Sequence, residues 1–433
     1  MRLFKVAFGV VALGALAVQT ANAVPSFVRQ TGLVCNQCHM TWTPNPDMTF
    51  TGTKFRLNGY RTPWVAEKIE AGEEGAINGR RLVLGVDGYL SYHMRSLLAT
   101  QSKPNSDPAL TAPKANAVSS QPFQSLAWDF TGPITENIGI WTEWYSTQQT
   151  TAAGNAFGPV DNDEYDVKMV FNPGGSGNIV GFGMNNQGRT SPFFGAFGSG
   201  VSSSQGNTVN VTAYTWLQDR AAFALAVIPG QTEVASGYDY QRMNWGFTGA
   251  VLPMNNDAMW IMVVGAYMVG NDMSPIGNVT GVNALRSGPL AGVNYSADDL
   301  GDAQRLLVDV RWGALDRGHW SFATATAFSS ENEEYTDLAK VKNTAVATSW
   351  RIFYDRTYGL LFNVGKRLTY SYTEANGTTV HNIPSDLSYG LGFVFRQAMN
   401  FAWELQFSNS QTLRLDQNWR NGWSWNLRWH YLY

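Results

Sequence analysis

Two cysteines and a histidine form the motif of this chain with the clearest chemical purpose. Cys35 and Cys38 are the only cysteines among the 433 residues, and His39 follows the second one directly. The pattern C-x-x-C-H is the attachment signature of c-type haem. The two thiols add across the two vinyl groups of the porphyrin, and the histidine then lies under the iron as its proximal ligand. We therefore expect one haem c, bound covalently by Cys35 and Cys38, with His39 on the iron.

Other uses of the cysteine pair explain fewer of these residues. In an oxidising compartment two cysteines commonly form a disulfide, but a disulfide does not need a histidine at the next position. A structural zinc site needs four ligands, often as two spaced pairs, and the other histidines, His93, His319, His381 and His430, are scattered along the chain. A thioredoxin-like redox pair lies near a βαβ unit, which the flanking sequence does not predict.

The ligand on the other side of the haem iron is left open by the sequence. Met48 is the first candidate, because it lies nine residues after His39 in the same segment and because His/Met ligation raises the haem potential. Met48 could equally be a packing residue. His93 is the second candidate, because its phase in an expected strand directs it into a lumen. A lumen histidine bonded to a neighbouring side chain is the alternative.

The first residues of the chain predict export. A basic start is followed by an apolar run from Val6 to Val18 and then by "ANA" at residues 21–23. This pattern is typical of a secretory signal peptide. The apolar run is too short for a spanning helix, which needs about 20 residues. We therefore expect residues 1–23 to be removed by cleavage after Ala23.

From about residue 80 onward, apolar and polar residues alternate. In "RLLVDVRW" at residues 305–312 every second residue is apolar, and Asp309 and Arg311 lie on the other face. The segments 387–395 and 423–433 alternate in the same way. Period-two alternation is typical of strands with two different faces. The aromatic residues, 13% of the chain, gather toward the segment ends, as in the girdles of membrane barrels.

Short and long connections also alternate along this region. The short ones fall near 131–136, 172–177, 218–220, 253–257, 314–318, 355–357 and 397–400, and longer ones, such as 147–163, 230–239 and 329–343, fall between them. Short periplasmic turns and long outer loops are the pattern of a transmembrane β-barrel, which has an even number of strands. We predict an all-β fold in which residues 80–433 form an outer-membrane barrel of about 16 antiparallel strands, surrounded by lipid, with both termini periplasmic.

The haem motif lies in the segment that precedes this barrel. Residues 24–79 number fewer than 60, which makes a marginal independent domain. A barrel of about 16 strands encloses an aqueous lumen. We therefore expect residues 24–79 to form a small monohaem cytochrome c domain that folds inside the barrel as a plug.

Two stretches of this plug segment carry a family resemblance. They are "SFVRQTGLVCNQCH" at 26–39 and "FTGTKFRLNGY" at 50–60. Both resemble the outer-membrane fusions of a monohaem cytochrome c with a porin, of the iron-oxidase type, while the barrel matches that family only in architecture. The matching positions are Arg29, Gln30, Thr31, Gly32, Phe50, Gly52, Lys54, Phe55, Gly59 and Tyr60. The segment between the two stretches, residues 40–49, departs from the family pattern. The resemblance implies electron transfer across the outer membrane and does not fix the electron donor.

The expected function is therefore electron conduction. Electrons would pass from an extracellular donor, with Fe²⁺ as first candidate, through the haem to a periplasmic cytochrome or copper protein. The protein would then be a one-electron Fe(II) oxidoreductase. Two alternatives stay open: a porin-like passage or sensing barrel whose haem is structural or regulatory, and a conduit that exports electrons to an extracellular acceptor. The haem would lie toward the outer mouth, or a periplasmic partner would insert from below.

Clusters of acidic residues fall in several expected outer loops. They are Asp161, Asp163, Glu164 and Asp166; Asp298, Asp299 and Asp302; and Glu331, Glu333, Glu334 and Asp337. Carboxylates of this kind could concentrate divalent cations near the outer mouth, although such runs are usually only solvated. The net charge of −3 gives no indication of nucleic-acid binding.

Overall fold

The computed structural model describes Cys38, residues 50–60, and the strands with some of their turns between residues 90 and 432. The elements are α4 (Phe50–Leu57), β1 (Leu90–Lys103), β2 (Ala117–Pro133), β3 (Ile138–Thr151), β4 (Gly154–Phe157), β5 (Asp161–Val170), β6 (Ile179–Asn185), β7 (Asn210–Leu217), β8 (Ala221–Ala235), β9 (Tyr238–Asn255), β10 (Met259–Asn271), β11 (Leu300–Ala314), β12 (Trp320–Tyr335), β13 (Lys340–Tyr354), β14 (Tyr358–Thr373), β15 (Val380–Asn382), β16 (Ser388–Ala398), β17 (Phe401–Leu413) and β18 (Trp419–Leu432). No helix in the described part of the chain is both long and apolar enough to cross a membrane.

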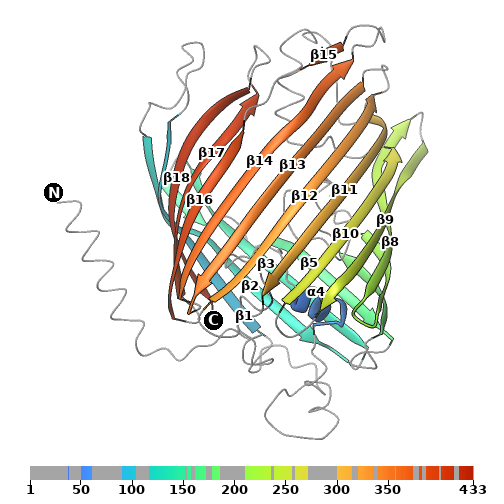
Figure 1. Cartoon of the computed structure of the whole chain (residues 1–433), viewed down its shortest axis with the longest axis horizontal. Helices are drawn as coiled ribbons and strands as arrows, with labels where there is room; N and C mark the ends of the chain where they lie inside the picture. Colours follow the sequence, from blue (N-terminus) through green and yellow to red (C-terminus); the bar gives the residue numbers. More distant parts are fainter. Residues whose placement is uncertain are drawn as a thin grey trace, which may run out of the picture.

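The strands form a closed antiparallel barrel (Figure 1). Strand β1 pairs with both β2 and β18, and this pairing closes the ring. Two short strands are additions to the ring, because β4 extends the hairpin of β3 and β15 pairs with β14. Of the eighteen described strands, sixteen therefore form the barrel wall. The prediction of an all-β barrel with about 16 antiparallel strands is confirmed.

The outer face of this wall is apolar. In β16 the side chains of Leu391, Phe393 and Phe395 are exposed, while Gly392 and Val394 between them are buried. Large apolar side chains that alternate outward around a closed barrel form the band that faces lipid. The predicted outward phase of the segment 387–395 is confirmed, and the fold is that of a transmembrane β-barrel.

Aromatic side chains concentrate at the end of the barrel that carries the short turns. Trp320 and Tyr354 lie with ring centroids 4.8 Å apart at the ends of β12 and β13. The rings of Tyr358 and Phe395 stack at 5.5 Å on the next pair of strands. Such aromatic residues mark the level at which a barrel crosses the membrane–water interface. The short-turn end therefore lies at one surface of the membrane.

The inner face of the wall is polar. Asp309 and Arg311 are buried on β11 and form an ion pair with each other. On β17 the amide of Gln406 donates a hydrogen bond to the buried carboxylate of Glu404. A polar interior is expected for a barrel whose outside faces lipid. The predicted inward phase of Asp309 and Arg311 is confirmed.

Several connections predicted as long outer loops are shorter in the structure. Strand β8 ends at Ala235 and β9 begins at Tyr238, so most of the predicted loop 230–239 is strand. The predicted loop 329–343 is likewise occupied by the ends of β12 and β13, where Glu334 pairs with Lys340. Beyond the membrane both faces of a strand meet water, so the apolar alternation ends before the strand does. The predicted loops were too long for this reason.

Candidate functional site

Helix α4 lies inside the barrel, near β5 and β10, at the short-turn end (Figure 1). It ends in a tight turn specified by the sequence "LNGY". The amide of Tyr60 donates to the carbonyl of Phe55 at 3.0 Å, and the amide of Gly59 donates to the carbonyl of Arg56 at 3.2 Å. These two bonds define a Schellman motif. The rings of Phe55 and Tyr60 pack edge to face with centroids 6.1 Å apart, which is the apolar contact that accompanies this motif.

The turn that follows α4 touches the backbone of β3 directly. Gly59 has a φ of 69°, in the left-handed region that a glycine adopts without steric cost. A Cβ atom built on Gly139 of β3 would lie only 2.1 Å from the carbonyl oxygen of Gly59. The absence of a side chain at Gly139 therefore allows the turn after α4 and the barrel wall to meet backbone to backbone.

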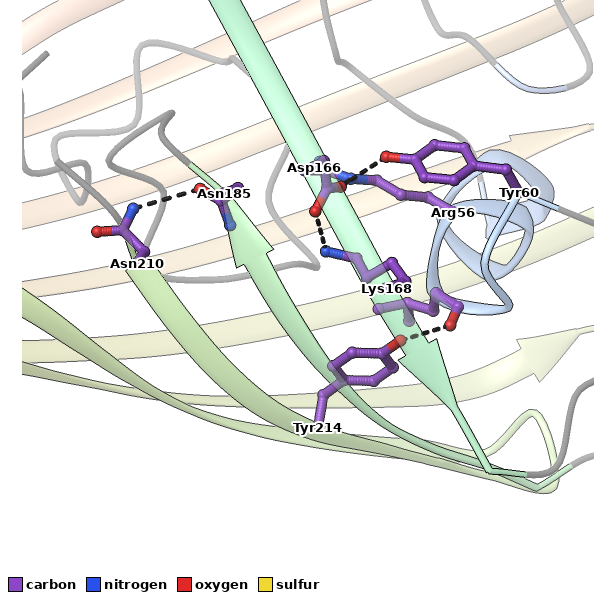
Figure 2. A network of polar contacts seen from close by, with 8 residues as sticks. Arg56, Tyr60, Asp166, Lys168, Asn185, Asn210 and Tyr214 are labelled. Atoms are coloured by element: carbon purple, nitrogen blue, oxygen red, sulfur yellow. Dashed lines mark hydrogen bonds and ion pairs between the residues drawn. The ribbon is translucent and has the colours of Figure 1, made fainter. Parts of the chain in front are cut away.

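One carboxylate on the barrel wall accepts three hydrogen bonds (Figure 2). Oδ2 of Asp166, on β5, accepts from Arg56 Nε at 2.8 Å and from the Tyr60 hydroxyl at 2.6 Å. Oδ1 of the same carboxylate accepts from the ammonium group of Lys168. All four side chains are buried. A buried carboxylate is stable when it is paired and hydrogen-bonded in this way, and we call these four residues the Asp166 cluster.

The tyrosine of the Asp166 cluster is held in its neutral form. Burial raises the pKa of Tyr60 well above its ordinary value, and the negative charge of Asp166 raises it further. The guanidinium of Arg56 acts in the opposite direction and does not reverse the shift. Tyr60 therefore remains a hydrogen-bond donor to Asp166 at physiological pH.

The two ends of α4 are held by side chains from β7. The hydroxyl of Tyr214 donates to the carbonyl oxygen of Leu57 at 2.8 Å, which satisfies one of the carbonyls that a helix leaves unpaired at its C-terminus. At the other end, the ring of Phe50 packs on the fully buried Trp216 with centroids 5.5 Å apart. The helix is therefore fixed along its whole length against β3, β5 and β7.

A further ion pair joins the helix to the turn between β7 and β8. Lys54 Nζ lies 2.7 Å from Asp219 Oδ2, and these side chains are 21% and 28% exposed. Trp216 donates to the other oxygen of Asp219 at 2.7 Å. Because the pair is open to water, we expect it to contribute no more than about 1 kcal/mol. The Asp166 cluster is the buried counterpart of this exposed pair.

The haem motif meets the same helix through Cys38, which is helical and half-buried. A Cβ atom on Gly52 of α4 would lie 2.1 Å from the carbonyl oxygen of Cys38. The backbone that carries this cysteine therefore rests directly on α4. A cysteine thiol whose backbone is held against a helix inside a closed wall has the chemistry that a thioether bond to a haem vinyl group requires. Cys35, His39 and Met48 lie outside the described residues.

The remaining histidines are spread over the barrel. His93 lies in β1, opposite Ala127 of β2 and Leu432 of β18. His430 lies in β18 opposite Ala402, and His381 lies in β15 opposite Tyr372. His319 falls outside the described residues. The assignment of His93 as a second candidate ligand stays a prediction.

The acidic clusters are not outer loops where the structure describes them. Asp161, Asp163, Glu164 and Asp166 belong to β5, and Glu331, Glu333 and Glu334 belong to β12. Asp302 belongs to β11, while Asp298, Asp299 and Asp337 lie outside the described residues. The expectation that Asp166 lies in an exposed loop was wrong, because the inward phase of β5 buries its side chain completely. In the described part of the chain, no group of three or more His, Cys, Asp or Glu residues is arranged to hold a metal ion.

The signal for Asp166 was present in the sequence. In "EYDVKMV" at residues 164–170, the polar Asp166 and Lys168 alternate with Tyr165, Val167 and Met169. Met169 is 44% exposed on the outer face, while Lys168 is buried. The barrel alternation therefore begins before residue 166, and extending it backward would have assigned Asp166 to the lumen.

Fold and site together define a transmembrane β-barrel of the outer-membrane type with a helix bound to the inside of its wall. No protein-family model matches the chain, and no curated protein matches it in sequence. Among solved structures, the chain is similar to OmpF of Salmonella typhi in complex with daunomycin, with 10% identity, a TM-score of 0.47, and 79% of this chain and 97% of that one covered. It is also similar to the outer-membrane channel DcaP of Acinetobacter baumannii, with 10% identity, a TM-score of 0.47, and coverage of 82% and 100%. The class assigned to this chain rests on its own strand pairing and outward apolar face.

Proposed function

We propose that this protein is an outer-membrane cytochrome–porin that carries single electrons between the cell exterior and the periplasm. The observation that carries the proposal is the position of Cys38, whose backbone rests on a helix that is bound inside a closed barrel. A haem attached there lies within a protein wall that lipid surrounds. Such an arrangement lets an electron cross the membrane while the plug occupies the lumen.

The chain supplies the haem site from its N-terminal segment. Cys35 and Cys38 would hold the haem through thioether bonds, His39 would be the proximal ligand of its iron, and Met48 is the first candidate for the second iron ligand. The haem supplies reversible one-electron chemistry, and His/Met ligation would favour electron acceptance because it raises the potential. Gly52 keeps α4 in contact with the backbone of Cys38.

The site lies nearer one surface of the membrane than the other. Helix α4 contacts the turn at residues 218–220 and the last residues of β5, which are at the short-turn end. In outer-membrane barrels the short turns face the periplasm, and we assign the same orientation here, with both termini periplasmic. The haem then lies toward the periplasm, which favours direct delivery of the electron to a periplasmic cytochrome or copper protein over a haem at the outer mouth.

The donor that we propose is extracellular Fe²⁺. Each Fe²⁺ gives up one electron and becomes Fe³⁺, and the electron is passed through the haem to the oxidised periplasmic carrier. Fe³⁺ is insoluble at neutral pH, so a cell benefits from leaving the metal outside and importing the electron alone. Outer-sphere transfer requires that the ion approach the haem edge, so Fe²⁺ would enter the outer part of the lumen, on the side of α4 that faces away from the short turns. The proposed activity is a one-electron Fe(II) oxidation.

Stopped-flow spectroscopy of the purified holoprotein mixed with Fe²⁺ tests this proposal. We expect the haem absorption bands to shift to those of the reduced form, and an oxidised periplasmic carrier to restore the oxidised bands. A matched sample of Cys35→Ala/Cys38→Ala protein should carry no covalent haem on a peroxidase-stained gel. Covalent staining that survives in this variant would refute thioether attachment.

The alternatives predict different results in the same measurements. If another donor reduces the haem and Fe²⁺ does not, the iron assignment is wrong and a different conduit remains. If the reduced haem passes electrons to an extracellular acceptor only, the direction of flow is outward. Rapid swelling of liposomes that contain the holoprotein, at the rate of an open porin, would instead favour a passage barrel with a structural haem.

A further inference from the structure

The Asp166 cluster divides the two oxygens of one carboxylate between the barrel and the plug. Oδ1 accepts from Lys168, which lies two residues away on the same strand. Oδ2 accepts from Arg56 and Tyr60, both of which belong to the plug. The barrel wall therefore presents a carboxylate that is half satisfied by its own strand and has its other oxygen directed at the plug (Figure 2).

The end of α4 and the turn that follows it place two hydrogen-bond donors of the plug on this carboxylate. Arg56 lies in the last turn of α4, and Tyr60 follows the left-handed Gly59. Tyr60 itself has a φ of 61°, which is uncommon for a residue with a side chain. This conformation places the Tyr60 hydroxyl and the Arg56 guanidinium on the same oxygen. The turn pairs two donors with one acceptor that is more than 100 positions away in the chain.

The charges of the Asp166 cluster favour one position of the plug against the barrel wall. The cluster contains two cations and one anion, all buried. Removal of the anion would take one ion-pair partner from Arg56 and from Lys168 and leave two buried cations close together, which is unfavourable. Displacement of the plug along the wall would have the same consequence for Arg56. The exposed pair of Lys54 and Asp219 has no comparable penalty, because water can solvate both groups.

Helix α4 connects the Asp166 cluster to the haem motif. Arg56 and Gly52 lie one turn apart on α4, and Gly52 rests on the carbonyl of Cys38. We propose that Asp166 is the positioning residue of the plug: through Arg56 and Tyr60 it fixes α4 in the lumen, and through Gly52 it fixes the height of the haem attachment site. The second part of this proposal depends on the proposed function, and the first part does not.

Planar-bilayer conductance and potentiometric titration of the full-length holoprotein test both parts. Asp166→Asn keeps the shape of the side chain and removes its charge. We expect at least a tenfold increase in the fraction of open-channel events, and a haem titration that broadens into more than one midpoint. Asp355→Asn is the matched control, because Asp355 is exposed at another short turn and also has a positive φ. It should behave like the unchanged protein.

A second substitution distinguishes a specific positioning role of Asp166 from general damage to the fold. Adding Arg56→Met to Asp166→Asn removes the buried cation that Asp166 had paired with, so the double variant should open less often than Asp166→Asn alone. General damage would make the double variant worse, and that result would overturn the proposal. If Asp166→Asn does not assemble in the membrane, Tyr60→Phe removes one donor at constant charge and should still give a smaller increase in open events.

The remaining outcomes separate this proposal from the proposed function. Asp166→Asn protein with unchanged conductance and an unchanged midpoint would refute the positioning role. Open channels with a single unchanged midpoint would refute the part that concerns haem height. Open channels in Asp166→Asn protein, together with a haem that accepts electrons from no donor in the unchanged protein, would support the positioning role of Asp166 and show that the electron-conduit proposal is wrong.

Discussion

Tyr60 donates a hydrogen bond of 2.6 Å to Asp166, although the two residues are 106 positions apart in the chain. One belongs to the segment that follows the haem motif, and the other belongs to an inward face of the barrel. Both side chains are buried. The bond therefore joins the two parts of the protein at a point that water does not reach, and its strength depends on the proton of Tyr60.

Docking of the plug should weaken at alkaline pH. Burial and the charge of Asp166 raise the pKa of Tyr60, whereas an exposed tyrosine titrates near pH 10. Above about pH 10 the undocked plug therefore loses this proton while the docked plug retains it. The contribution of Tyr60 is complete below that pH and decreases by about 1.4 kcal/mol per pH unit above it. The fraction of open-channel events, measured from pH 8 upward, should therefore rise above about pH 10 in the unchanged protein. Tyr60→Phe should flatten it, and an equal slope in both proteins would contradict the assignment.

A single methyl group on β3 should also displace the plug. Gly139→Ala would bring a Cβ atom to 2.1 Å from the carbonyl oxygen of Gly59, and overpacking of this kind typically costs about 1–3 kcal/mol. Bilayer recordings should show more open events, while the barrel keeps the heat-dependent gel mobility of a folded wall. Gly265→Ala is the matched control, because a Cβ atom there would meet no atom within 4 Å. Equal behaviour of the two variants would mean that the plug does not rest on β3.

The membrane position of the barrel can be tested at Phe393. This side chain is 47% exposed in the middle of β16, on the apolar outer face. Phe393→Arg should lower the free energy of unfolding by about 2–4 kcal/mol in lipid vesicles. Phe393→Leu keeps the apolar character and should cost less. Urea titration of refolded protein in vesicles provides the measurement. A cost for arginine no larger than that for leucine would argue against lipid contact at this residue.

The sequence predicted the barrel because its pattern is local. Alternation such as that in residues 387–395 depends on neighbouring residues alone, and each strand repeats the same requirement of an apolar outside and a polar inside. The haem motif is local for the same reason, since Cys35, Cys38 and His39 lie within five residues. The barrel could therefore be predicted from one chain, while the haem that the motif indicates stays a prediction.

The docking of the plug could not be predicted in this way. Arg56 and Asp166 meet across 110 positions, and a single sequence gives no indication that an arginine in the last turn of α4 and an aspartate among other acidic residues form a pair. The residues that carry the family resemblance include Gly52, Gly59 and Tyr60, and the resemblance itself gives no physical reason for them. The structure supplies the reason, because Gly52, Gly59 and Tyr60 each make a contact that depends on their size or their hydroxyl group.

The sequence does not determine the identity of the second iron ligand, opposite His39. Met48 precedes α4 by two residues in the sequence. We expect Met48→Ala protein to keep its covalent haem, because Cys35 and Cys38 are unchanged. Its midpoint potential should fall, since a thioether ligand raises the potential, and its reduced haem should bind carbon monoxide at the vacated position.

Two controls decide between the candidates for this ligand. Met169→Leu changes a methionine that is 44% exposed on the outer face of β5, and it should leave the potential unchanged. His93→Gln should also leave the potential and the carbon monoxide binding unchanged if Met48 is the ligand. If His93→Gln changes the potential and allows carbon monoxide to bind while Met48→Ala does not, His93 of β1 is the iron ligand. In that case the haem itself joins the plug to the barrel. If neither substitution opens the iron, both candidates are wrong and the sixth ligand comes from another residue.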